Sequence, residues 1–261
     1  MLLDRFKMGG QVVVVTGAGR GIGRGCALGF AEAGAHVVCA ARTLDQIQET
    51  ASQVEAQGVQ SLAVPCDVSD PNQRQKLIDA TVEKWGRIDV LINNAGGSPP
   101  RPALETSDTM FNRAFDFNVT TAFSLTRMAV PHMQRGEGGA VVNISSAAGR
   151  LAQSNFAAYG TAKAALSFMT RQLGQELAPR VRVNAIAVGS VGTSALLPFL
   201  DESTRQKMEA MTPMGRLGTV EDIALAALFL GSSAASWVTG KIFEVDGGTE
   251  STNWPFDPSS Q

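Results

Sequence analysis

Tyr159 and Lys163 stand four residues apart in an alanine-rich run, 156–178, that is expected to form a long helix. At this spacing two side chains lie on one face of a helix, one turn apart. Tyrosine has an ordinary pKa of about 10, and a cation one turn away is expected to lower it. Such a pair could exchange a proton with an alcohol or a ketone near pH 7. A solvated surface pair has the same spacing, so the remaining sequence must decide.

The composition is that of an ordinary globular chain, with 261 residues and a formal charge of −2. Without runs of Lys and Arg there is no sign of nucleic-acid binding, and the apolar runs are too short to cross a membrane. Residues 1–10 lack a signal-peptide pattern. Cys26, Cys39 and Cys66 are scattered and predict buried, reduced thiols, which favours a cytoplasmic protein. His36 and His132 have no ligand cluster around them, so no metal site is predicted.

Short apolar runs alternate with helical segments of about ten residues or more, a pattern typical of βαβ units. The expected strands are 11–16, 36–41, 61–65, 88–92, 140–144, 181–187 and 241–245. The expected helices are 21–34, 43–57, 70–85, 107–134 with an interruption at Pro131, 156–178, 194–211 and 220–230. The alternation predicts an α/β fold: a doubly wound, seven-stranded parallel sheet with helices on both faces, a Rossmann fold, in one domain over 1–248. A loosely ordered tail, 249–261, is expected to follow.

Three glycines, Gly17, Gly21 and Gly23, come after the first expected strand and open the first expected helix. Glycines permit a tight turn and a close approach of the backbone to a pyrophosphate, while the helix presents its N-terminus to the anion. A glycine turn can also serve helix–strand packing alone. Its position between a strand and a helix nevertheless predicts a dinucleotide site.

The residues that end the second expected strand bear on the choice of cofactor. A fold that prefers NAD usually has an acidic residue there to hold the ribose 2′-hydroxyl, but this chain has Ala41 followed by Arg42. A guanidinium would grip a 2′-phosphate, and Arg20 in the glycine turn supplies a second positive charge. We therefore expect NADP(H) to be preferred over NAD(H), unless Arg42 merely begins a surface helix.

These and further motifs occur in an order that resembles the short-chain dehydrogenase/reductase family over residues 10–248. Asp67-Val68 resembles the family's adenine-binding pair, Asn93-Asn94-Ala95-Gly96 its fourth-strand motif, and residues 188–193 its nicotinamide-binding segment. The resemblance implies a catalytic set of Asn118, Ser146, Tyr159 and Lys163. The cofactor residues that the turn and the resemblance imply are Gly17, Arg20, Gly21, Ile22, Gly23, Arg42, Asp67, Val68, Asn94, Tyr159, Lys163, Val191 and Thr193.

The resemblance also implies a mechanism. Ser146 would donate to the carbonyl oxygen of a ketone, and Tyr159 would supply the proton. Lys163 would hold the nicotinamide ribose and lower the tyrosine pKa, and Asn118 would hold a water that links Lys163 to solvent. Ser145 adjoins Ser146, but successive residues of a strand point in opposite directions, and the family spacing selects Ser146.

Two positions depart from the family pattern. Val188 replaces the usual proline of the nicotinamide segment, which leaves that turn less fixed in φ. Gly160 replaces a serine that often follows the tyrosine. Neither residue takes part in proton transfer, so the predicted chemistry is unaffected.

The segment expected to cover the substrate, near 190–217, is strongly apolar and rich in methionine. Its apolar residues are Leu196, Leu197, Phe199, Leu200, Met208, Met211 and Met214. They suit a bulky lipophilic ketone or alcohol, although the same residues could simply pack the lid onto the body. Residues 96–102, 206–208 and 234–240 are most similar to bacterial 7α-hydroxysteroid dehydrogenase-type members of the family, which implies a hydroxysteroid-like substrate.

Two other functions stay open at this point. One is a 3-oxoacyl carrier-protein reductase, which needs a basic surface beside the site, and Arg101, Arg150 and Arg216 could contribute to it. The other is a non-catalytic NADP-binding scaffold, against which a complete catalytic set argues. Family members are commonly homotetramers, and small residues on the Tyr159 helix would permit a close approach of two subunits.

Overall fold

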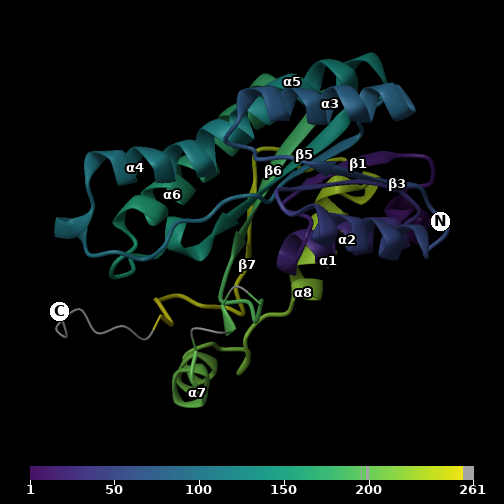
Figure 1. Cartoon of the computed structure of the whole chain (residues 1–261). Helices are drawn as coiled ribbons and strands as arrows, with labels where there is room; N and C mark the ends of the chain where they lie inside the picture. Colours follow the sequence, from purple (N-terminus) through teal and green to yellow (C-terminus); the bar gives the residue numbers. More distant parts are fainter. Residues whose placement is uncertain (195, 198–199, 255–261) are drawn as a thin grey trace.

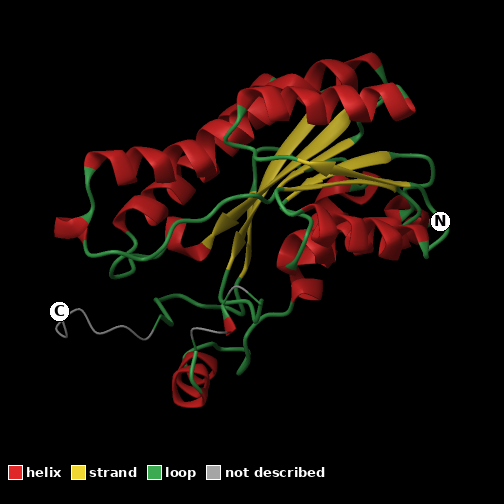
Figure 2. Ribbon diagram, in the orientation of Figure 1, coloured by secondary structure: helices red, strands yellow, loops and turns green. Residues whose placement is uncertain are grey.

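The valine-rich run at the start of the domain forms the central strand β1 (Val12–Thr16), in which every residue is buried. Apolar residues on both faces suit a sheet that is covered on both sides. All strand pairs are parallel, in the order β3-β2-β1-β4-β5-β6-β7. The other strands are β2 (His36–Ala41), β3 (Ser61–Pro65), β4 (Val90–Asn93), β5 (Gly139–Ser146), β6 (Val181–Val188) and β7 (Ile242–Val245). The computed structural model describes residues 1–194, 196–197 and 200–254 (Figures 1 and 2).

Helices cover both faces of this sheet, as Figure 1 shows. They are α1 (Gly21–Glu32), α2 (Leu44–Glu55), α3 (Pro71–Trp85), α4 (Asp108–Phe115), α5 (Thr121–Arg135), α6 (Ala157–Glu176), α7 (Glu202–Ala210) and α8 (Val220–Gly231). Val13 and Val15 of β1 pack in one core with α1, α2 and α8, whereas Val12 and Val14 pack in the other with α3, α5 and α6. The predicted doubly wound sheet is confirmed.

The strand order reverses between β1 and β4, which are neighbours in the sheet although β2 and β3 separate them in the chain. At such a switch point the connections leave toward opposite faces, and a crevice opens beyond the carboxyl ends of the strands. β5 extends two residues beyond its expected end, because Ser145 and Ser146 still pair with Ala187 and Val188 of β6. Ser146 is therefore the last residue of β5, at the carboxyl end of the sheet beside that crevice.

Two expected helices differ from the prediction. The helix expected over 107–134 is broken by a π-helical segment, Asp116–Thr120, and not at Pro131, which lies inside α5. Pro131 is exposed, so its missing N–H leaves a carbonyl without a helical partner on an outer side of α5. Within the expected helix 194–211, the only α-helix among the described residues is α7. It begins after Asp201, whose side chain caps it by accepting from Thr204 N.

The tail also differs from expectation over 249–254. Thr249 and Asn253 are each only 4 % exposed, so this part of the tail is packed onto the body. The expected boundary at residue 248 therefore cuts through packed structure. Phe199, expected in the lid, and 255–261 of the expected tail lie outside the described residues.

Candidate active site

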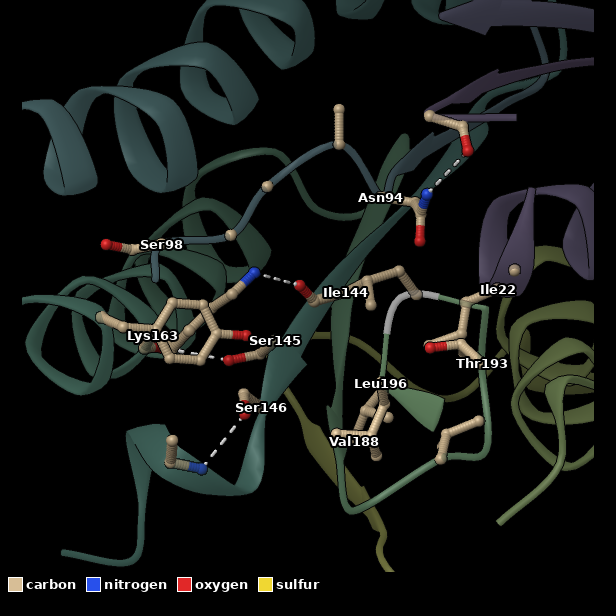
Figure 3. Close-up of a pocket in the computed structure, with 18 of the residues that line it drawn as sticks. Ile22, Asn94, Ser98, Ile144, Ser145, Ser146, Lys163, Val188, Thr193 and Leu196 are labelled. Atoms are coloured by element: carbon tan, nitrogen blue, oxygen red, sulfur yellow. Dashed lines mark hydrogen bonds between the residues drawn. The ribbon is translucent and has the colours of Figure 1, made fainter. Parts of the chain in front are cut away.

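The turn after β1 is shaped by glycines packed against the end of β4. Gly17 has a left-handed φ of +67°, and a Cβ on it would lie 2.6 Å from Asn94 Nδ2. That amide donates to the carbonyls of Thr16 at 2.9 Å and of Gly17 at 3.3 Å (Figure 3). A Cβ on Gly23 would lie 2.2 Å from Gly17 O. A larger residue at either glycine would displace the turn. Its backbone could then no longer approach a pyrophosphate closely.

A continuous cavity of about 920 Å³ runs from this turn to helix α6. Ser146, Tyr159 and Lys163 line one end of it. Twelve of the predicted cofactor residues line it: Gly17, Arg20, Gly21, Ile22, Arg42, Asp67, Val68, Asn94, Tyr159, Lys163, Val191 and Thr193. Of the predicted residues only Gly23 and Asn118 do not line it, since both lie beneath its surface. The volume is at the upper end of what small-molecule sites occupy, about 300–1,000 Å³.

The far end of the cavity is positively charged and meets the open N-terminus of α1. Arg20 is the N-cap of α1 and provides no side-chain cap, so the first backbone N–H groups stay open to an anion. Arg42 is exposed at the end of β2, and Thr43 and Gln46 of the following segment line the same region. Within the described residues neither Arg20 nor Arg42 forms an ion pair with a carboxylate.

The segment that follows β6 faces the glycine turn across the cavity. Val191 pairs with Gly218 in an isolated parallel bridge, and Gly192 N donates to Gly218 O at 2.9 Å. Thr193 then lies against α1, because a Cβ on Gly21 would be 3.6 Å from its Cγ2. Val191 and Thr193 are thereby fixed in place without the proline that Val188 replaces.

The two serines at the end of β5 both line the cavity, but their hydroxyls have different partners. Ser145 Oγ is buried, lies 2.8 Å from Ser167 Oγ and donates to Lys163 O at 3.1 Å. Ser146 Oγ accepts from Ala148 N at 3.2 Å (Figure 3). It also interacts with the Tyr159 hydroxyl. Ser145 thus supports the packing of α6 on β5, and Ser146 is the serine beside the tyrosine.

Lys163 is held beneath Tyr159 and away from solvent. Its Nζ donates to Ile144 O at 2.8 Å and lies 5.6 Å from the centroid of the Tyr159 ring (Figure 3). Burial lowers the pKa of Lys163 to about 8. Burial also raises the pKa of Tyr159, and the interaction with Ser146 opposes this only in part. The net shift is therefore upward, whereas the spacing of Lys163 and Tyr159 predicted a lowered tyrosine pKa, because desolvation of Tyr159 is the largest effect.

Asn118 lies in the π-helical segment and fastens the loop after β4. Its Oδ1 accepts from Gly97 N at 2.8 Å, and its Nδ2 donates to Gly97 O at 3.0 Å and Ala114 O at 2.8 Å. A Cβ on Gly96 would lie 2.7 Å from this Oδ1 and 3.2 Å from Lys163 Nζ. The Asn118 amide and the Lys163 ammonium therefore both lie close to Gly96. π-Helical turns of this kind occur frequently at functional sites.

The lining of the cavity includes residues that the sequence did not single out. Gln153 and Phe156 come from the loop before α6, and Asn253 and Trp254 come from the C-terminal segment. No spacing or motif marks these positions, because they reach the site only through tertiary packing. Among the described lid residues, Leu196 and Leu200 line the cavity, whereas Met208 is buried away from it.

Other kinds of site have little support. The three cysteines are free and buried, and burial raises the pKa of Cys26 to about 12 and of Cys66 to about 11, so neither is an activated thiol. Within the described ranges no three His, Cys, Asp or Glu side chains are grouped so that they could hold a metal ion. No helix in the described part of the chain has the length and apolarity needed to span a bilayer.

Comparison with known proteins agrees with this geometry. Residues 17–250 match a family described as enoyl-(acyl carrier protein) reductase. An uncharacterised oxidoreductase of Mycobacterium tuberculosis (strain CDC 1551 / Oshkosh) is 48% identical over 95% of both chains. The 7α-hydroxysteroid dehydrogenase of Escherichia coli (strain K12) is 38% identical over 94% of this chain and 96% of its own.

A solved structure gives the same result in three dimensions. The 7α-hydroxysteroid dehydrogenase complexed with NADH and 7-oxo glycochenodeoxycholic acid superposes with a TM-score of 0.91 at 38% identity. The match covers 95% of this chain and 97% of that one. The crevice at the strand switch point, the glycine turn and the Ser146–Tyr159–Lys163 group thus occur in a fold shared with a nicotinamide-dependent enzyme. The chain belongs to the short-chain dehydrogenase/reductase family of oxidoreductases.

Proposed function

We propose that the protein is an NADP(H)-dependent oxidoreductase that interconverts a secondary alcohol and a ketone. The observation that carries the proposal is the convergence of Ser146, Tyr159 and Lys163 at one end of a cavity whose other end is the glycine turn. The cavity, the close glycine packing and the open α1 N-terminus fit a dinucleotide. When bound, that cofactor supplies or receives the hydride.

We assign proton transfer, ribose binding and water binding to four side chains. The Ser146 hydroxyl donates to the carbonyl oxygen of the ketone, and Tyr159 passes its proton to the same oxygen or takes it back in the reverse direction. Lys163, held by Ile144 O, binds the ribose hydroxyls of the nicotinamide half. Asn118 Oδ1 has a second lone pair, with which we propose that it holds the water leading from Lys163 to solvent.

The raised pKa of Tyr159 predicts a definite pH dependence. Because burial favours the neutral phenol, Tyr159 stays protonated through the neutral range, so its protonation should not limit ketone reduction there, while alcohol oxidation should quicken as the pH rises. The chain has one tyrosine, so tyrosinate absorbance titrates this residue alone. The titration midpoint of the protein should lie above that of free tyrosine. A midpoint below pH 9 would contradict the burial argument.

The charge at the end of β2 supports the preference for NADP(H). Arg42 and Arg20 line the cavity without a described carboxylate partner, and Ala41 brings no negative charge. The related solved structure contains NADH, so cofactor choice has to rest on these side chains of this chain.

Arg42→Asp should therefore raise KM for NADPH about 10- to 100-fold, since it removes a charge-assisted hydrogen bond and adds repulsion. KM for NADH should stay level or fall. Arg5→Asp, which makes the same charge change on an exposed residue that does not line the cavity, is the matched control. An equal or lower KM for NADH than for NADPH in the unchanged protein would refute the preference.

We propose a bulky, lipophilic, hydroxysteroid-like substrate. The supporting observation is the apolar lining next to Tyr159, which includes Leu151, Phe156, Leu196 and Leu200. A panel of ketones and alcohols with NADPH and NADH, including steroids, small cyclic ketones and 3-oxoacyl thioesters, tests the substrate class. Turnover of thioesters alone would reject the steroid-like class.

A 3-oxoacyl carrier-protein reductase is the second candidate, and it is favoured by the similarity of this chain to a 3-oxoacyl-[acyl-carrier-protein] reductase of Thermotoga maritima, which is 34% identical. The arginines that would bind an acidic carrier are engaged elsewhere. Arg150 lies within 3.2 Å of Glu244, Asp246 and Glu250, Arg216 pairs with Asp222 at 2.7 Å, and Arg101 is 3.7 Å from Glu105. Paired cations attract a partner weakly, so we rank this function second. A non-catalytic scaffold would bind NADPH without turning over any ketone.

We propose a cytoplasmic homotetramer. Exposed aromatic and apolar residues on α4, α5 and α6 support the assembly: Met110, Phe111, Phe115, Phe123 and Phe168. Clusters of exposed large apolar side chains are typical of subunit contacts, and we propose that these residues form one. Light scattering tests the assembly, and a monomer at micromolar concentration would contradict it.

A further inference from the structure

The C-terminal segment 249–254 returns over the cavity of its own chain. Thr249, Asn253 and Trp254 all line that cavity. Asn253 is buried and bonds to two other segments of the chain: its Nδ2 donates to Thr212 Oγ1 at 3.0 Å, and its Oδ1 accepts from Ser190 Oγ at 2.9 Å. The segment is therefore built into the site and connects the two ends of the lid.

A single arginine fastens the start of this segment. Arg150 Nη2 donates to Thr249 O at 2.6 Å and to Asp246 at 3.0 Å, and Nη1 donates to Glu250 at 3.2 Å. Its Nε also lies 3.2 Å from Glu244 of β7. Arg150 follows the short 3₁₀ turn Ala147–Gly149 that begins at Ser146. The same side chain thus connects the catalytic strand to the tail.

Three aromatic rings continue from the catalytic tyrosine to the end of this segment. Phe156 meets Tyr159 at a centroid distance of 5.8 Å and an angle of 61°, and it meets Trp254 at 5.2 Å and 88°. Both are edge-to-face geometries that stabilise aromatic pairs. Asn155 has a φ of +68°, which turns the chain just before Phe156, and its carbonyl accepts from Arg101 N at 2.8 Å.

We propose that Phe156 and Trp254, here called the aromatic wall, determine substrate specificity by receiving the apolar skeleton of a bulky ketone. Arg150 is a positioning residue that holds the tail so that Trp254 stays against Phe156. The inference rests on the proposed oxidoreductase function. Phe156 and Trp254 are themselves uncharged, and the cavity is also lined by the apolar residues Leu151, Leu196 and Leu200, so we expect the part of the ligand against the wall to be uncharged.

The test compares kcat/KM for a four-ring steroid ketone with kcat/KM for cyclohexanone. Trp254→Ala should lower this ratio by on the order of tenfold, chiefly through a higher KM for the steroid, and Trp254→Phe should retain most of it. Arg150→Gln should lower the ratio in the same direction, and Arg150→Lys should restore part of it. Trp237→Phe is the matched control, because Trp237 is 99% exposed and does not line the cavity. An unchanged ratio in Trp254→Ala would overturn the proposal.

A binding measurement separates this proposal from the catalytic one. The chain has three tryptophans, so Trp85→Phe with Trp237→Phe leaves Trp254 as the sole tryptophan fluorophore. The steroid ketone should change its emission, and Arg150→Gln should shift the emission of the free protein toward that of a solvent-exposed indole. If the emission of Trp254 stayed unchanged at a saturating steroid concentration, the aromatic wall would be rejected. If the wild-type protein reduced neither ketone, but the protein with Trp254 as its sole tryptophan and its Arg150→Gln variant showed these emission changes, the catalytic function would be rejected and the aromatic wall kept.

Discussion

Tyr159→Phe should lower kcat for ketone reduction about 1,000-fold or more, because general acid catalysis by a positioned side chain contributes about 10²–10⁴-fold. The substitution removes the only hydroxyl proposed to transfer the proton. It keeps the ring that packs edge-to-face against Phe156 at 5.8 Å, so the surroundings should stay in place. Steady-state rates with NADPH measure the loss.

Cofactor binding gives the control for this variant. NADPH titration, followed by the change in nicotinamide fluorescence, should give a Kd within a few-fold of that of the unchanged protein. The tyrosinate absorbance should disappear, since Tyr159 is the only tyrosine in the chain. Turnover within tenfold of the unchanged enzyme would remove Tyr159 from the role of acid, and a lost NADPH affinity would show a structural effect instead.

Ser146→Ala should lower kcat/KM about 10²- to 10³-fold, the usual cost of losing a hydrogen-bond donor to a developing oxyanion. Ser146 stands at the end of β5 with its hydroxyl beside Tyr159, where a carbonyl oxygen would receive both donors. The loss should appear with steroid and small ketones alike, because the donor meets the reacting oxygen and not the skeleton. Steady-state kinetics on both ketones measure it.

The neighbouring Ser145 provides a matched control, whose substitution should affect stability and not activity. Ser145→Ala removes hydrogen bonds to Ser167 and Lys163 O, each contributing about 1 kcal/mol to the free energy of unfolding. It should lower the thermal midpoint and leave most of the activity. If Ser145→Ala abolished turnover and Ser146→Ala did not, the two serines would have to exchange roles.

The alternation of short apolar runs with helical segments was enough to predict the doubly wound sheet, because a strand buried on both faces must be apolar throughout. The glycine turn was predicted from its place between a strand and a helix, and Tyr159 and Lys163 were paired by their helical spacing, whereas Ser146 was selected by the family resemblance. The π-helical break before α5 could not be predicted in this way. There the side chain of Asn118 bonds to Gly97 of a distant loop, and the helix adapts to that contact.

The sequence by itself determined the parallel sheet and the glycine turn, and its resemblance to the family identified the predicted catalytic side chains. Only the tertiary structure decided in which direction the pKa values of Tyr159 and Lys163 are shifted. Burial raises the pKa of Tyr159 and lowers that of Lys163, against the effect expected from their spacing alone, since desolvation depends on everything packed around a residue. It also decided that Trp254 lies beside Phe156, 98 residues away in the chain, because only folding brings such distant residues together.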